Sequence, residues 1–210
     1  MDEYKTVKAP GGDELVVKKS RFIGQACPAA TEAEAILWIK RVRASHPEAG
    51  HTCYAYVVGK NEGVMRYSDD GEPGGTAGMP ILSVIRARRA VDCCVTVTRY
   101  FGGVLLGAPG LIRAYTKAAA IALDAAKVIT MEKSVRFWAG MDYSMWERAN
   151  YYLGGAPVIN EGVEFSATVT ATLVARARDY PTVCEALARI TDGRAEALEL
   201  ERFFYGWEEG

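Results

Sequence analysis

An alanine-rich run with the periodicity of a helix ends near Thr130, and a run of alternating apolar and polar residues begins after it. A helix buries side chains three or four residues apart, whereas a strand buries every second side chain. The change of period therefore predicts a boundary between two domains, residues 1–130 and residues 131–210. Because strand-like and helix-like runs occur in both parts, we expect an α+β chain. A length of 210 residues is enough for one to two ordinary domains.

Charge is divided unevenly between these two parts. The whole chain carries 25 Lys and Arg against 26 Asp and Glu, so its formal net charge is −1. Residues 1–130 carry 17 basic and 13 acidic residues, a balance of +4, and residues 131–210 carry 8 and 13, a balance of −5. Nucleic-acid-binding domains are usually strongly basic. Phosphate binding is therefore expected in the first domain if it occurs at all, because a charge of +4 is compatible with it but does not demand it.

The sequence predicts a cytoplasmic protein without a membrane segment. Its N-terminus is acidic and lacks the apolar core of a secretory signal. Charged residues interrupt the most apolar stretches well before the ~20 residues that a membrane-spanning helix needs. The five cysteines include no CxxC pair, which favours reduced thiols in the core over disulfides or a zinc site.

The first domain shows strands interleaved with helices. A capping box, Thr31 followed by Glu34, predicts a helix that ends near Ser45. Thr76 is expected to cap a second helix, and Pro109 to occupy the first turn of a third. The expected strands are residues 14–26 (a strand or a bent hairpin arm), 51–58 and 91–98, and the second and third helices are residues 76–87 and 109–127.

Two glycine-rich loops, residues 67–78 and 98–110, each lead from extended chain into the start of a helix. Free N–H groups and the helix dipole favour an anion there, and glycine lets the backbone approach a ligand. We interpret the loops as a basic groove for phosphate or a nucleic-acid backbone. The alternative is that both loops are tight turns that serve helix–sheet packing, because neither matches a Walker A or a dinucleotide-binding motif. The candidate contacts are Lys19, Arg21, Gly75, Thr76, Arg99, Tyr100, Gly102, Gly103, Arg113 and Lys117.

The first loop also carries an acidic motif, Ser68-Asp69-Asp70-Gly71-Glu72-Pro73. Three carboxylates within four residues suit Mg²⁺, but aspartate is equally a common turn residue that bonds to the local backbone. We expect the turn role, with no metal site and no cofactor. His51 and Cys53 would face the same side of a strand, which permits a reactive pair but favours a structural one. No catalytic residue is therefore predicted.

The second domain is expected to run strand, helix, strand, strand, helix, strand, the order of a ferredoxin-like βαββαβ domain. A hairpin is expected across Asn160-Glu161-Gly162, followed by one long strand over residues 163–176. Alternation along that strand leaves an open face rich in threonine, on which Arg136 and Trp138 are the exceptions. RNA-binding sheets stack bases on exposed aromatic side chains. We therefore expect a structural or protein-contact role for this acidic domain.

Five motifs extend the pattern of the two loops over roughly residues 18–117. In chain order they are Lys18-Lys19-Ser20-Arg21-Phe22-Ile23, His51-x-Cys53-Tyr54-Ala55-Tyr56, Ser68-Asp69-Asp70-Gly71-Glu72-Pro73-x-Gly75-Thr76-Ala77-Gly78-x-Pro80, Thr98-Arg99-Tyr100-Phe101-Gly102-Gly103-x-x-Leu106-Gly107 and Leu111-x-Arg113-Ala114-Tyr115. Together they resemble the YigZ/IMPACT family. The second domain resembles the ferredoxin-like C-terminal domain of the bacterial, YigZ-type branch of that family.

The resemblance implies a fold and a field of activity. The first domain would have the ribosomal-protein-like α/β sandwich of elongation factor G domain IV, and the second would be similar to domain V of that factor. Eukaryotic IMPACT relatives regulate translation through protein contacts with the activator of a stress-responsive kinase. No enzyme activity is implied.

We therefore expect a non-enzymatic binding and regulatory protein linked to translation. It would contact RNA, the ribosome or a translation-control protein through its basic, glycine-rich groove. One alternative is a small-molecule phosphoryl-transfer enzyme that uses the same loops with a nucleotide and Mg²⁺. Another is a protein-binding module that acts through the acidic second domain. The sequence makes no prediction of the oligomeric state.

Overall fold

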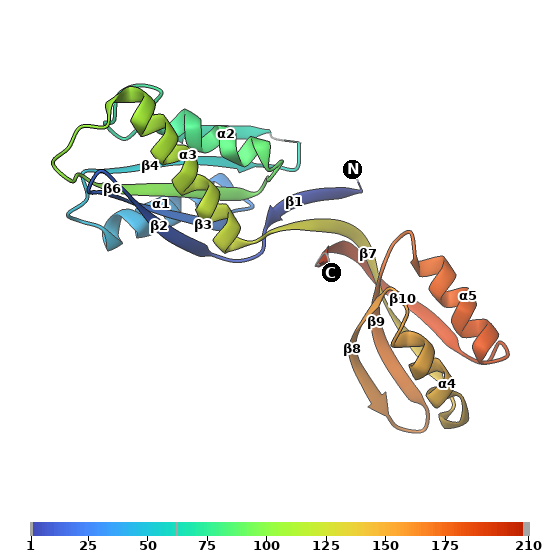
Figure 1. Cartoon of the computed structure of the whole chain (residues 1–210). Helices are drawn as coiled ribbons and strands as arrows, with labels where there is room; N and C mark the ends of the chain where they lie inside the picture. The colour runs from blue at the N-terminus through green and yellow to red at the C-terminus, as the bar shows by residue number, and fades with distance from the viewer. Residues whose placement is uncertain (1, 62, 208–210) are drawn as a thin grey trace. The chain divides into compact units, whose positions relative to one another are not determined.

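The computed structural model describes residues 2–61 and 63–207, which form two compact units (Figure 1). The N-terminal unit is Tyr4–Thr130, and the C-terminal unit is Met131–Trp207 together with residues 2 and 3. Each unit has its own hydrophobic core, so each is described by itself. Both units combine helices and strands, as expected, and each contains antiparallel strand pairs.

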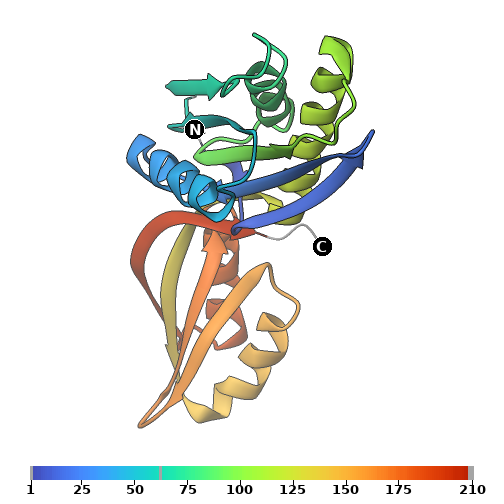
Figure 2. The ribbon, with the colours of Figure 1, turned by 90° about the vertical axis from the view of Figure 1, so that its left-hand side faces the viewer.

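The described residues of the N-terminal unit form three helices and one sheet of five strands. They are β2 (Gly11–Val17), β3 (Ser20–Pro28), α1 (Glu32–Ser45), β4 (His51–Val58), β5 (Val64–Ser68), α2 (Gly78–Ala87), β6 (Cys93–Tyr100) and α3 (Gly107–Ala126). The sheet is antiparallel with strand order β2-β3-β6-β4-β5. Helices α2 and α3 cover one face and α1 covers the other (Figures 1 and 2). The central strand β6 is therefore buried on both faces, including its polar residues Thr96 and Thr98.

Helix α1 and strand β4 have the predicted extents. The capping box at the start of α1 forms with one difference from the expected pattern. The Thr31 hydroxyl accepts a hydrogen bond from the N–H of Glu34 at 3.2 Å. The Glu34 carboxylate accepts from the N–H of Ala30 at 2.8 Å, one residue before the expected Thr31. The box therefore satisfies two backbone donors around the first turn.

Most of residues 14–26 belong to a hairpin of two strands. β2 pairs with β3 along its whole length, with Val17 opposite Ser20. Lys18 and Lys19 make the turn, with φ of 45° and 67°. Positive φ at both central residues is the geometry of a tight two-residue hairpin. Both lysines are exposed at the tip of this turn. The sequence interpretation also missed two short strands, β5 and β1 (Glu3–Val7).

The two helices that follow the glycine-rich loops start differently from the prediction. Thr76 is not the cap of α2, because its hydroxyl donates to the Pro73 carbonyl at 2.6 Å and the helix begins at Gly78. Helix α3 begins at Gly107, two residues before Pro109. Proline is tolerated there because the first-turn N–H groups have no partner within the helix.

The C-terminal unit follows the predicted order of strand, helix, strand, strand, helix, strand. Its elements are β7 (Val128–Met141), α4 (Tyr143–Leu153), β8 (Val158–Phe165), β9 (Val169–Arg176), α5 (Tyr180–Ile190) and β10 (Glu196–Trp207). The strands lie in the order β10-β7-β9-β8, and β1 also pairs with β7. Helices α4 and α5 cover one face of this sheet and enclose the core of the unit (Figure 1).

The predicted hairpin across Asn160-Glu161-Gly162 is wrong. Strand β8 continues through these residues with a bulge between Asn160 and Gly162, because the Asn160 side chain accepts from the N–H of Gly162 at 3.0 Å. The chain reverses instead between Phe165 and Val169, where the N–H of Ser166 donates to the Thr168 carbonyl at 3.0 Å. Residues 163–176 are therefore parts of two strands. Only the second buries the expected Val169, Ala171, Leu173 and Ala175, and it buries Val174 as well.

Candidate nucleic-acid interface

The carboxylate of Asp69 organises the first glycine-rich loop. It accepts hydrogen bonds from the N–H groups of Gly75 at 2.8 Å, Ala77 at 3.0 Å and Gly78 at 2.8 Å. Burial acts to raise the pKa of Asp69, but these three donors outweigh it and hold the pKa below its ordinary value. The N-terminus of α2, expected to attract an external anion, is thus occupied by an anion of the protein itself.

We expect Asp69→Ala to lower the free energy of unfolding by about 1–3 kcal/mol at neutral pH, because three backbone donors lose a charged acceptor. The pKa of Asp69 is depressed on folding, so its stabilisation is present above the unfolded value of about 4. It is lost as the pH falls through the folded pKa. Urea unfolding should show the difference between wild type and variant shrinking from about pH 7 to about pH 3.

A matched control is Asp142→Ala, which changes the residue before α4, where no side-chain capping bond forms. Its stability should change by less than about 0.5 kcal/mol. An Asp69 effect of the same size at both pH values would contradict the capping role.

Asp70 bonds to a different set of groups from Asp69. One of its oxygens pairs with the Arg43 guanidinium at 2.5 Å, and the other accepts from the N–H of Thr52 at 2.6 Å. Its carbonyl contacts His51 Nδ1 at 2.8 Å, and the Cys53 thiol donates to the neighbouring Asp69 carbonyl. Burial raises the pKa of Cys53 to about 12, so this thiol stays protonated.

The carboxylates of Asp69 and Asp70 therefore bond to other groups of the chain. Within residues 2–61 and 63–207, no group of three or more His, Cys, Asp or Glu side chains is placed to hold a metal ion. The phosphoryl-transfer alternative depended on Asp69 and Asp70, and both carboxylates already accept hydrogen bonds from the chain. The motif connects strand β4 to helix α2, because Asp70 bonds to Thr52 and Asp69 bonds to Gly78.

Glu72 and Arg99 form a buried ion pair that ties the two glycine-rich loops together. Arg99 donates to both Glu72 oxygens, at 2.8 and 3.1 Å, and Tyr115 donates its hydroxyl to Glu72 at 2.7 Å. Arg99 is 6% exposed and Glu72 7%. The Arg99 guanidinium also lies 5.4 Å from the ring centres of Phe22 and Phe101. Burial raises the pKa of Tyr115, so its hydroxyl remains a donor.

This arrangement corrects the role assigned to Arg99. An arginine enclosed by a carboxylate and two aromatic rings is not an exposed phosphate ligand. Its charge fixes the loops in place, and the surface positive charge must come from other residues. Two other predicted phosphate contacts are also occupied by the protein itself. Thr76 is buried, and the N–H of Gly75 donates to Asp69.

The second loop packs directly on the β2–β3 turn. The N–H of Gly102 donates to the Ser20 hydroxyl at 3.2 Å. A Cβ atom at Gly102 would lie 2.0 Å from the Lys19 carbonyl carbon, so only glycine fits this approach. Gly103 has a φ of 79° and open space around it, which marks it as a turn residue. The contact brings the exposed lysines of the turn next to the start of α3.

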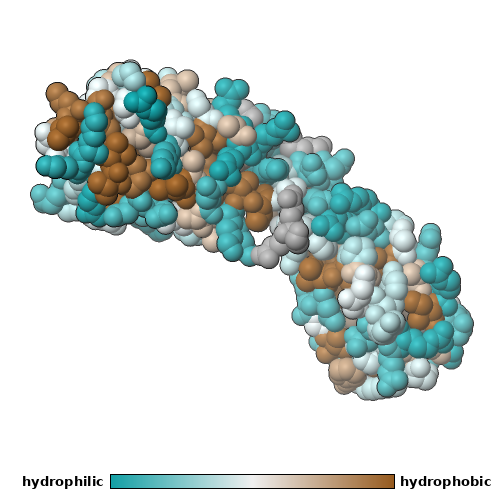
Figure 3. Space-filling view, in the orientation of Figure 1, coloured by the Kyte–Doolittle hydropathy of each residue, from teal (hydrophilic) through white to brown (hydrophobic). Residues whose placement is uncertain are grey.

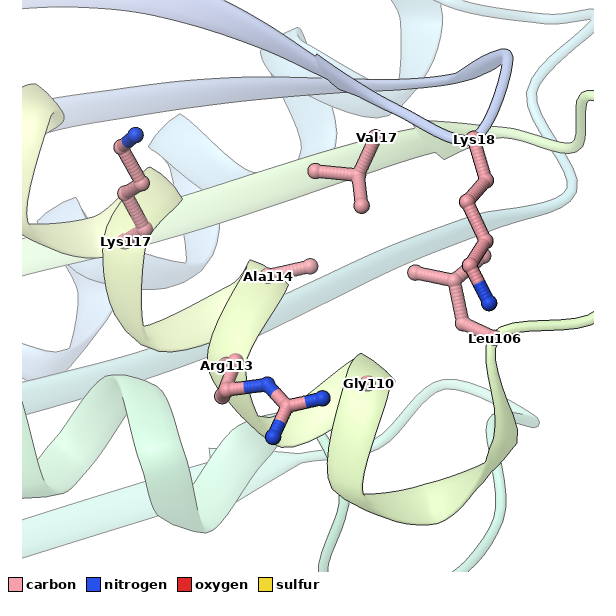
Figure 4. Close-up of a pocket in the computed structure, with 7 residues that line it drawn as sticks. All are labelled: Val17, Lys18, Leu106, Gly110, Arg113, Ala114 and Lys117. Atoms are coloured by element: carbon pink, nitrogen blue, oxygen red, sulfur yellow. The ribbon is translucent and has the colours of Figure 1, made fainter.

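A pocket of about 170 Å³ lies between the β2–β3 turn and the first three turns of α3 (Figure 4). We call it the basic pocket, and its lining consists of Val17, Lys18, Leu106, Gly110, Arg113, Ala114 and Lys117. Lys18, Arg113 and Lys117 are exposed, and none of the three has an ion-pair partner among the described residues. The structure thus brings together two predicted contacts, Arg113 and Lys117, with Lys18, which the sequence interpretation did not select.

The remaining predicted contacts surround the turn without lining the pocket. Lys19 is exposed beside Lys18. Arg21 pairs with Glu14 at 2.8 Å and lies over the Tyr100 ring, whose hydroxyl contacts His46 at 3.0 Å. Arg21 and Tyr100 are therefore already engaged, and Lys19 is the additional cation available near the basic pocket.

Exposed apolar side chains also occur in the loop before α3. Leu105 is 83% exposed and Phe101 57%. Figure 3 shows apolar surface interspersed with hydrophilic side chains over the N-terminal unit. This loop is therefore a candidate contact surface.

The helix-free face of the C-terminal sheet is a weaker candidate for nucleic acid. Arg136 lies on it, over the Phe203 ring, but pairs with Glu161 and Glu201. Arg176 lies over Trp207 and pairs with Glu132. Aromatic side chains are present, but the positive charges between them are neutralised by carboxylates.

Comparison with known proteins decides the family. The family model named Impact N-terminal domain matches residues 18–123, half of the chain, and this segment contains both glycine-rich loops. The chain belongs to the IMPACT family. The family interpretation drawn from the motifs is thereby confirmed, and membership implies a regulatory protein linked to translation.

Relatives in this family match the chain to different extents. IMPACT family member YvyE of Bacillus subtilis is 35% identical over 201 residues, which covers 96% of this chain and 93% of YvyE. IMPACT family member YigZ of Escherichia coli is 42% identical over 117 residues, or 55% of this chain and 57% of YigZ. A crystal structure titled as that of a hypothetical protein is 28% identical, with a TM-score of 0.61, and the match covers 96% of this chain and 98% of that one.

In the described residues, no helix is long and apolar enough to cross a membrane.

Proposed function

We propose that this protein is a non-enzymatic regulator linked to translation that contacts RNA through the basic pocket of its N-terminal unit. The observation that carries the proposal is the cluster of Lys18, Arg113 and Lys117, three exposed cations around one pocket with no ion-pair partner among the described residues. Other arginines of the chain, such as Arg21 and Arg136, lie against carboxylates.

Phosphate groups are the natural complement of this cluster. Arg113 and Lys117 are four residues apart on one face of α3, where like charges repel unless an anion lies between them. RNA carries a phosphate on every nucleotide, so one strand can offer an anion to each of several separate cations. Ribosomal RNA offers the same groups, so contact with the ribosome falls under the same proposal. An acidic translation-control protein is the competing partner.

The architecture supports this link to translation. We propose that the N-terminal unit is the ribosomal-protein-like sandwich found in elongation factor G domain IV. We propose that the C-terminal unit is ferredoxin-like, which its strand order β10-β7-β9-β8 supports. Residues 1–130 and 131–210 would then be the two domains, and the protein would act in the cytoplasm, where translation takes place.

Salt dependence tests the RNA contact. Binding of a labelled single-stranded RNA to the full chain should weaken about 20-fold between roughly 50 and 200 mM salt. This follows from three phosphate contacts and a slope of about −0.7 per contact for single strands. Fluorescence anisotropy measures it directly. Absence of binding at the lowest salt would overturn the proposal, and capture of an acidic protein in place of RNA would favour the competing partner.

A further inference from the structure

The basic pocket has an apolar interior, which phosphate binding alone does not require. Val17, Leu106 and Ala114 form its walls, and the cations stand around them (Figure 4). Lys18 extends beside Leu106, Arg113 lies beside Gly110, and Lys117 follows one turn further along α3. A mostly apolar lining with a few polar groups is typical of a small-molecule site.

We infer that the basic pocket takes one unpaired base of single-stranded RNA, while Lys18, Arg113 and Lys117 bind the neighbouring phosphates. This inference rests on the proposed function and adds a substrate class to it. In duplex RNA the bases are stacked inside, and the protein meets mainly phosphates and sugars. An unpaired base enters a pocket without the cost of breaking a base pair.

The dimensions of the pocket agree with a single base. Its volume of about 170 Å³ suits one flat ring and is too small for a base pair. The loop that ends at Leu106 also exposes Phe101 and Leu105. These side chains offer apolar surface to further unpaired bases of the strand, as stacking platforms do in single-strand-binding proteins.

The test compares one RNA sequence as a single strand and as a duplex, bound to the full chain at the same salt concentration. Charge density favours the duplex, so a preference for the single strand must come from the bases. We expect the single strand to bind about tenfold more tightly, and a strand of the same length made only of abasic sugar-phosphate to lack that advantage.

Leu106→Ser should lower the preference for the single strand to below about threefold and leave the salt slope unchanged, because it removes a wall and no cation. The matched control is Ile112→Ser, which changes an exposed apolar residue of α3 outside the pocket lining. Equal binding of single strand, duplex and abasic strand would overturn the inference while leaving RNA binding intact. Failure of all three to bind at low salt would overturn the proposed function and the inference together.

Discussion

Replacing Glu72 by alanine is expected to lower the free energy of unfolding of the N-terminal unit by about 3–5 kcal/mol. The substitution leaves the Arg99 charge buried and without its carboxylate, and it removes the acceptor of the Tyr115 hydroxyl. Removing one partner of a buried pair costs more than the pair contributes, because the remaining charge stays desolvated. Because Glu72 and Arg99 belong to different loops, both loops should lose order together. Urea unfolding of the full chain, followed by circular dichroism, measures the loss.

Two further variants separate this effect from a general loss of negative charge. Glu48→Ala removes an exposed carboxylate of the same unit and should change stability by less than about 0.5 kcal/mol. The double variant Glu72→Met with Arg99→Met removes both charges and should recover much of the stability that Glu72→Ala removes. A loss below about 1 kcal/mol for Glu72→Ala, or no recovery in the double variant, would contradict the role of the pair.

Sequence patterns predicted the helices and strands well where residues close together in the chain determine the local structure. β-branched and aromatic residues placed β4, and a local capping box placed the start of α1. The same reasoning failed at residues 160–162, since Gly162 looks like a turn residue but sits in a bulge. The choice between a bulge and a turn depends on pairing with β9, which lies beyond the reach of a local pattern.

The candidate site was only partly predictable, because some of its contacts join residues that are far apart in the sequence. The sequence identified both loops and two cations of the pocket, Arg113 and Lys117. It could not show that Arg99, 27 residues from Glu72, is buried against that carboxylate. Lys18 had a signal that was missed, since Lys18-Lys19 between two alternating runs marks a hairpin tip. That this tip faces α3 follows from the Gly102 contact, which only the structure reveals.

Reversing two charges of the basic pocket should nearly abolish RNA binding. In the variant Arg113→Glu with Lys117→Glu, the affinity for single-stranded RNA at about 50 mM salt is expected to fall about 100-fold, roughly tenfold for each phosphate that is no longer bound. The two new carboxylates also repel the RNA backbone. Both side chains are exposed, so the stability of the unit should change little. Weaker binding would therefore reflect the surface and not the fold.

The control variant has the same change of charge, placed on the helix that covers the opposite face of the sheet. Lys40 and Arg41 are exposed on α1, which packs against the face opposite α2 and α3. The variant Lys40→Glu with Arg41→Glu alters the net charge equally, so it reports any effect of overall charge on attraction of RNA.

The most direct test of the RNA contact is the RNA affinity of wild type and these two double variants over a range of salt concentrations. We predict that the Arg113/Lys117 variant binds about 100-fold more weakly than wild type at low salt and has a salt slope reduced by about 1–1.5. The Lys40/Arg41 variant should stay within about threefold of wild type, with an unchanged slope. Equal losses of affinity in the two variants would show that RNA responds only to net charge, and wild-type affinity in the Arg113/Lys117 variant would place the contact elsewhere on the protein.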